Sequence, residues 1–155
     1  MANYVFVTQW VIPAPLDRVW EALHRVERWP EWWRGLVRLT TLQAGDAQGV
    51  GAVHRLAWKG ALPYILDMEM TTVAIDHHRT VDLRAKGELE GRGLWTLTQQ
   101  GSATAVRYDW QVQTNKFWMN LLAPVARPIF AWNHDVIMRW GEQGLTQLLN
   151  TTGRS

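Results

Sequence analysis

The hydrophobic period of the chain changes twice, and this constrains the fold more than any other feature. Between Leu36 and about Thr114 apolar residues recur at every second position, as in strands, whereas the flanking segments follow the 3.6-residue period of helices. Turn residues divide the central region into predicted strands at 36–43, 51–59, 64–75, 79–86, 89–99 and 103–114. Short connections and one-sided alternation favour an antiparallel sheet with one buried face.

One more strand and two short helices are predicted before this region. Residues 4–12 alternate as a strand, and both faces are largely apolar, so we expect each face to be covered over part of its length. Pro15 suits the first turn of a helix to about Val26, whose apolar stripe is formed by Leu16, Val19, Trp20 and Leu23. Residues 29–35 are typical of one further helical turn that ends at Gly35.

After Asn115 the helical period returns and predicts a long C-terminal helix. Residues 118–122 favour a preliminary turn, and either Pro124 or Pro128 can begin the main helix, which runs to about Leu149. Its expected inner stripe consists of Phe130, His134, Ile137, Gly141, Leu145 and Leu148. The whole pattern predicts a single α+β domain, residues 1–155, in which a curved seven-stranded antiparallel sheet wraps around this helix.

Composition argues against several classes of function. The 155 residues include no cysteine, which excludes disulfide scaffolds and thiolate chemistry. The net charge of +2 comes from scattered residues, so we expect no nucleic-acid partner. No apolar run reaches the roughly 18 residues of a transmembrane helix, and the N-terminus lacks signal-peptide features. We therefore expect a soluble, cytoplasmic protein.

Neither a cofactor nor a metal ion is expected from the motifs. The sequence contains no nucleophile elbow, P-loop or dinucleotide fingerprint. His77 and His78 follow Asp76 in a predicted turn and are expected to be solvated, while His24 and His54 have no partner at metal-ligand spacing.

Tryptophan is the unusual residue, with 11 copies against three Tyr and three Phe. Each indole adds a large flat surface and one N–H donor. Trp20 and Trp110 are expected to anchor the core, whereas Trp33, Trp58 and Trp118 are equally compatible with core packing and with ligand contact.

Three motifs carry a resemblance to a known superfamily. They are Ile12-Pro13-Ala14-Pro15 with Val19-Trp20, then Gly91-Arg92-Gly93-Leu94-Trp95-Thr96-Leu97, and last the segment from Trp118 through Trp132-Asn133-His134-Asp135 to Gly141. In these the chain resembles the START-like, helix-grip (SRPBCC) superfamily, and within it the polyketide cyclase/dehydrase-like group. The resemblance spans the whole chain and implies a deep apolar cavity between the sheet and the C-terminal helix. Members bind lipids, sterols, hormones or polyketides, some are aromatase/cyclases, and others are co-chaperones.

Residues on the predicted inner faces are the candidates for such a site. For ligand binding they are Trp10, Trp33, Trp58, Tyr64, Met68, Met70, Trp95, Trp118, Phe130 and Ile137. For acid–base catalysis they are His134 and Tyr108, although the preferred interpretation of His134 is a structural one, a buried histidine that hydrogen-bonds the helix to the sheet. Asn133 and Asp135 are expected on other faces of the helix, and Arg84 is expected to point outward.

Three functions remain open at this point. The first is binding of a small hydrophobic molecule (aromatic, acyl or lipid-like) without covalent chemistry. The second is a polyketide cyclase/dehydrase-type enzyme that uses His134 and Tyr108. The third is a protein-interaction or co-chaperone-like module, which predicts exposed apolar surface at 36–42 or 124–128 and a cavity well below about 300 Å³. A homodimer is compatible with all three.

Overall fold

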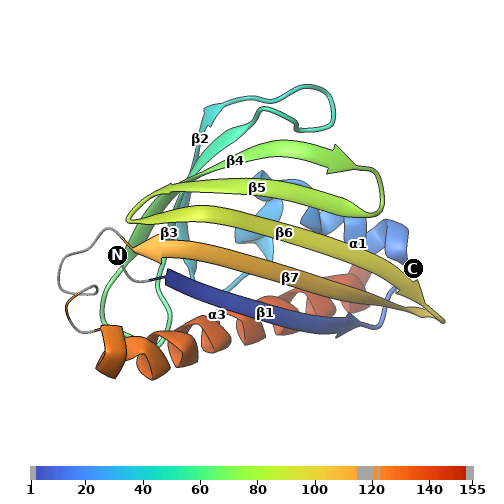
Figure 1. Ribbon diagram of the computed structural model, residues 1–155. Helices are drawn as coiled ribbons and strands as arrows, with labels where there is room; N and C mark the ends of the chain where they lie inside the picture. The colour runs from blue at the N-terminus through green and yellow to red at the C-terminus, as the bar shows by residue number, and fades with distance from the viewer. Residues whose placement is uncertain (1–2, 115–120, 122, 153–155) are drawn as a thin grey trace.

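The computed structural model describes residues 3–114, 121 and 123–152, and it confirms the predicted fold class (Figure 1). The elements in order are β1 (Asn3–Ile12), α1 (Leu16–Leu23), the 3-10 helix η1 (Val26–Glu31), β2 (Leu36–Gln43), β3 (Val53–Trp58), β4 (Leu66–Asp76), β5 (Thr80–Gly87), β6 (Leu89–Gln100), β7 (Ala103–Thr114) and α3 (Ala123–Thr152).

All seven strands form one antiparallel sheet in the order β1-β7-β6-β5-β4-β3-β2. Strands β2 to β7 follow one another as neighbours, and β1 pairs with β7 at the far edge. The sheet curves, and α3 runs along its concave side beneath β1 and β7 (Figure 1).

Element boundaries differ from expectation mainly in the helices. Helix α1 ends at Leu23 rather than near Val26, because Arg25 has an extended backbone and η1 then begins at Val26. Helix α3 begins at Ala123, which places Pro124 in its first turn, where no N–H is needed. The preliminary turn expected at 118–122 lies outside the described residues, except for Leu121.

The expectation that both faces of β1 are covered is wrong. Tyr4, Trp10 and Ile12 are buried on the inner face. Val5, Val7 and Val11 on the outer face remain half exposed or more, because α1, η1 and α3 all lie on the concave side of the sheet (Figure 1).

Two glycines let α3 approach the η1 region closely. A Cβ atom on Gly141 would lie 2.6 Å from the Trp33 indole and 2.9 Å from that of Trp10, and one on Gly144 would collide with the backbone carbonyl of Trp32. One turn earlier, the Trp33 Nε1–H donates a hydrogen bond to the Ile137 carbonyl oxygen (2.9 Å). The helix is thereby fixed against the Trp32–Trp33 segment at three successive positions.

Gly144→Ala tests this close contact. Alanine favours an isolated helix by about 1 kcal/mol over glycine, but here the added methyl must displace a backbone carbonyl. We expect the free energy of unfolding to fall by about 1–3 kcal/mol in urea denaturation. Gln143→Ala, at the exposed neighbouring position, is the control and should change stability by less than about 0.5 kcal/mol. Equal or greater stability of the Gly144 variant would contradict the contact.

Candidate functional site

A cavity of about 100 Å³ lies between the sheet and the first half of α3. Its walls are mostly aromatic side chains and methionines. The lining residues are Tyr4, Phe6, Trp29, Trp33, Trp58, Tyr64, Leu66, Met68, Met70, Leu89, Trp95, Tyr108, Trp110, Val112, Phe130, Asn133, His134, Ile137 and Met138. None of these side chains is acidic, and the only basic one is a histidine.

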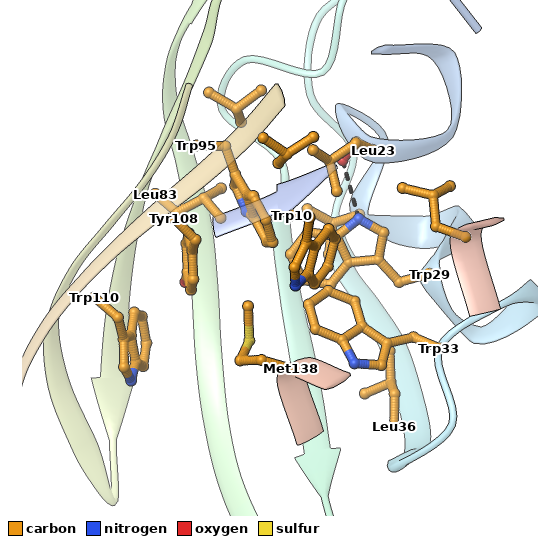
Figure 2. Close-up of a cluster of buried hydrophobic side chains, with 14 of the residues drawn as sticks. Trp10, Leu23, Trp29, Trp33, Leu36, Leu83, Trp95, Tyr108, Trp110 and Met138 are labelled. Carbon is orange, nitrogen blue, oxygen red and sulfur yellow. Dashed lines mark hydrogen bonds between the residues drawn. The ribbon is translucent and has the colours of Figure 1, made fainter. Parts of the chain in front are cut away.

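A cluster of indoles forms one wall. Trp33 is its centre, with ring centroids 4.9 Å from Trp58, 5.1 Å from Trp29 and 6.0 Å from Trp95. The Trp29 Nε1–H donates to the Leu23 carbonyl oxygen (2.9 Å), which ties the cluster to the end of α1 (Figure 2). The wall is therefore held by hydrogen bonds to helices at two points, through Trp29 and Trp33.

A stack of three rings on β6 and β7 forms a second wall, and we call it the sheet stack: Trp95, Tyr108 and Trp110. Trp95 and Tyr108 are cross-strand partners whose centroids lie 4.0 Å apart at 21°, and Trp110 continues the stack at 5.7 Å and 21° (Figure 2). The Tyr108 hydroxyl lies over Gly93, where any Cβ would collide with it. This explains a glycine in the Gly91-Arg92-Gly93 motif.

A second stack joins β1 to α3, and we call it the helix stack: Tyr4, Phe6 and His134. The centroids of Phe6 and His134 are 4.3 Å apart at 15°, and those of Tyr4 and Phe6 are 6.0 Å apart at 21°. The Arg127 guanidinium lies 4.9 Å from the centre of the Tyr4 ring and donates to the Asn3 carbonyl oxygen. Arg127 thus contacts the helix stack at Tyr4, and the Tyr4 side chain also lines the cavity.

His134 is neutral at physiological pH in this environment. Its side chain is 13% exposed, and burial lowers its pKa from 6.5 to about 4. Asp135 Oδ1 lies 3.9 Å from Nδ1, beyond hydrogen-bond distance, and neither ring nitrogen has a hydrogen-bond partner among the described residues. Burial also raises the pKa of the Tyr108 hydroxyl, and raises that of Tyr64 to about 12. The tyrosines therefore remain protonated.

Asn133 lines the cavity, contrary to its expected position away from the His134 face. Its Oδ1 accepts a hydrogen bond from the Leu62 backbone N–H (3.1 Å), which holds the segment that carries Tyr64. The inner stripe of α3 is wide enough to include neighbouring positions, because a helix advances only 100° per residue. Asn133 follows Phe130 by three residues, and this helical spacing could have indicated that both lie on the inner side of the helix.

The predicted site residues lie mostly on the cavity wall. Those that do are Trp33, Trp58, Tyr64, Met68, Met70, Trp95, Tyr108, Phe130, His134 and Ile137. Trp118 lies outside the described residues. The sequence interpretation missed four further lining residues: Tyr4, Phe6, Trp29 and Met138. Tyr4 and Phe6 alternate with Trp10 on the inner face of β1, and this alternation could have identified them.

Trp10, a predicted ligand-contact residue, is not on the cavity wall. It is buried but is not among the lining residues, because its ring packs against Trp32, Trp33 and Trp95 and reaches Gly141 of α3. Trp110 is a buried core residue as predicted, and it also lines the cavity at the end of the sheet stack. Trp20 is a core residue as predicted, 1% exposed.

The remaining polar candidates lie elsewhere. His77 and His78 are exposed in the β4–β5 turn, as predicted, and their rings contact that of Trp20. Arg84 points outward and pairs with Asp82. Within the described part of the chain, no group of His, Asp and Glu is arranged to hold a metal ion. No helix described here is long and apolar enough to cross a membrane.

His134→Phe tests the cost of burying this imidazole. Because the pKa of His134 is lower in the folded state, the unfolded state binds the proton first as pH falls. The resulting contribution of His134 to the free energy of unfolding is present above pH 6.5 and is lost as the pH falls toward 4. Between pH 7 and 4.5 we expect the wild type to lose roughly 2–3 kcal/mol more than the variant in urea denaturation. Parallel pH profiles would contradict the assignment; His24 and His54, whose pKa values burial also lowers, contribute equally to both proteins.

Several solved structures share this fold. The protein TTHA0849 of Thermus thermophilus is 16% identical, with a TM-score of 0.76 over 94% of this chain and 99% of that one. The Zhui aromatase/cyclase of Streptomyces sp. R1128 is 15% identical, with a TM-score of 0.75 over 99% and 98%. A norcoclaurine synthase of Thalictrum flavum is 13% identical, with a TM-score of 0.59 over 92% and 96%. At these identities the likeness concerns the fold.

The sequence itself identifies the family. No curated protein matches the chain. The family model described as polyketide cyclase / dehydrase and lipid transport matches residues 12–136, which include the last residue of β1, all of β2 to β7 and the start of α3 as far as the lining residues Phe130, Asn133 and His134. The chain therefore belongs to the polyketide cyclase / dehydrase and lipid transport family.

Proposed function

We propose that the protein binds a small hydrophobic molecule in the cavity between the sheet and α3. The observation that carries this proposal is a cavity lined by aromatic and aliphatic side chains, with no carboxylate, lysine or arginine on its wall. Ligand pockets are mostly apolar with a few placed polar groups, and here those groups are the three tyrosine hydroxyls, Asn133 and His134.

Cavity volume limits the size of the ligand. About 100 Å³ is below the usual 300–1,000 Å³ of ligand pockets. It is of the order of the roughly 150 Å³ engineered cavity that binds benzene. Met68, Met70 and Met138 line the space, and their flexible side chains can adjust to a ring. Among the expected ligands, the volume favours a single aromatic ring over an acyl chain or a lipid.

The cyclase alternative is less well supported by the electrostatics. A general acid–base catalyst works best with a pKa near the operating pH. Burial instead lowers the pKa of His134 to about 4 and raises that of Tyr108. The pKa values of the two candidate residues therefore both lie far from neutral pH, one below it and one above it. A volume of about 100 Å³ is also small for a folded poly-β-keto chain. Both observations favour binding without chemistry.

Toluene binding followed by methionine methyl NMR tests the proposal. We expect saturable shifts of the Met68, Met70 and Met138 methyls with a dissociation constant of roughly 1 mM or tighter. Met70→Trp should fill the cavity and abolish these shifts. Leu42→Trp, which places the same indole on a half-exposed position of β2, should leave them intact. Shifts that rise linearly without saturation in the wild type would contradict the proposal.

A protein-interaction module is the second candidate, because the two features expected of it are present. The cavity is below 300 Å³, and apolar side chains are exposed at Val37 and Leu42 and along one face at the start of α3. That face consists of Val125 (77% exposed), Ile129 (47%) and Trp132 (53%). We call it the apolar stripe.

A second copy of the chain is the partner that suits this stripe. Val125 and Trp132 lie seven residues, or about two helical turns, apart on the same face of α3. Two antiparallel copies of the helix would therefore place Val125 of one against Trp132 of the other. Such self-complementarity is what a two-fold interface requires.

Sedimentation velocity of Trp132→Glu tests this second candidate. We expect a wild-type dimer and a monomeric variant with an unchanged melting temperature, because Trp132 is exposed in the isolated chain. Leu42→Glu, which introduces the same charge at an exposed apolar position on β2, should remain dimeric. A wild type that is monomeric at high micromolar concentration would rule the interface out.

A further inference from the structure

We propose that the ligand of this cavity is a neutral aromatic molecule with one hydroxyl or N–H group, such as a phenol or an indole, that hydrogen-bonds to His134. The inference rests on the proposed binding function and narrows it from hydrophobic molecules in general to one chemical class. Three properties of the wall support it: ring orientation, charge and unpartnered polar atoms.

Ring orientation favours an aromatic ligand. In the sheet stack Tyr108 packs a face against Trp95, and in the helix stack Phe6 packs a face against His134, while Trp110 and Tyr4 are near-parallel to these pairs at a greater distance. The stacked faces are closed to a ligand, which leaves the edges of Tyr108 and Phe6 for contact with it. Ring edges carry the positive part of the quadrupole and attract the negative face of another ring. A ligand ring is therefore favoured over a saturated one of the same size.

The same orientation disfavours a cationic ligand. A cation binds to the face of an aromatic ring, and one face of Tyr108 and one of Phe6 are covered by Trp95 and His134. The cavity wall also offers no carboxylate to compensate a positive charge. A quaternary ammonium group would therefore find fewer open ring faces here and no charged partner on the lining.

Charge disfavours an anionic ligand as well. No lysine or arginine lines the cavity, and His134 is neutral at pH 7. Arg127 contacts Tyr4, but its guanidinium donates to the Asn3 carbonyl. An anion would be transferred from water to an apolar cavity without a paired charge, which is strongly unfavourable. The ligand is thus neutral when bound.

Unpartnered polar atoms indicate what the neutral ligand carries. Within the described residues, both ring nitrogens of His134, the Tyr4 hydroxyl and the Trp95 Nε1–H are buried without a hydrogen-bond partner, and all three residues line the cavity. A neutral imidazole has one accepting nitrogen. Among these side chains only His134 and Tyr4 can accept a hydrogen bond, so a ligand O–H or N–H would complete the set. The Trp95 Nε1–H and the second His134 nitrogen are donors that likewise have no partner among the described residues.

Calorimetry with five probes at pH 7 tests the proposal: phenol, toluene, cyclohexanol, benzoate and tetramethylammonium. We expect phenol to bind at least about 10-fold more tightly than toluene, because toluene cannot make the hydrogen bond. Phenol should also bind at least about 10-fold more tightly than cyclohexanol, because cyclohexanol has no aromatic ring face. A tenfold difference corresponds to about 1.4 kcal/mol. Benzoate and tetramethylammonium should bind more weakly than phenol by a larger factor.

His134→Phe tests the hydrogen bond to the ligand while keeping an aromatic ring at this position of α3. The variant keeps an aromatic ring at the position stacked on Phe6 but removes the hydrogen-bond acceptor, so the advantage of phenol over toluene should disappear whatever the change in toluene affinity itself. Asp135→Asn is the matched control on the exposed side of the same helix and should leave phenol affinity unchanged.

The outcomes distinguish the two levels of the proposal. If toluene and cyclohexanol bind as tightly as phenol, the cavity function stands and the phenol class is overturned. Tighter binding of tetramethylammonium or benzoate than of phenol would also overturn the class. If no probe binds saturably, the class and the proposed binding function both fail. Retained phenol preference in His134→Phe would remove His134 as the acceptor.

Discussion

The close approach of α3 to the Trp32–Trp33 segment is the contact on which the cavity depends. A helix on a curved sheet can pack at many distances, and bulky side chains along its inner face would hold it away. At Gly141 and Gly144 there is no side chain, so the Trp33 indole and the Trp32 carbonyl reach the helix itself. This contact fixes the rest of α3. The direction of α3 that this contact sets determines where His134 lies, two turns earlier in the helix. The position of His134 in turn places the helix stack and that part of the cavity wall.

Aromatic stacking then limits what the cavity can hold. Trp95 stacks on Tyr108 and Phe6 on His134, so the lining offers ring edges and a few polar atoms without partners among the described residues, but no carboxylate, lysine or arginine. Burial, rather than a nearby charge, accounts for the displaced pKa values of His134 and Tyr108. Groups held in their neutral forms are suited to recognise a hydroxyl or an amine N–H, and less suited to move a proton at pH 7.

Much of this architecture was predictable because local patterns encode it. Alternation in β6 and β7 places Trp95 and Tyr108 on the inner face, and helical spacing does the same for Phe130 and Ile137. Periodicity identifies a face but not the distance between layers. It therefore could not show that Trp10 is sealed behind the indole cluster, that Asn133 reaches the cavity, or how small the cavity is. These depend on where α3 meets Trp33.

The division between a backbone shell and an aromatic filling has an evolutionary consequence. Strand pairing and the glycine contacts of α3 define the shell, whereas the volume inside it is set by side chains such as Trp29, Trp58 and Trp110. Exchange of one indole for a smaller residue enlarges the space without altering a strand register. Ligand size can thus diverge between descendants of one ancestor by single substitutions, while the sheet and its helix persist.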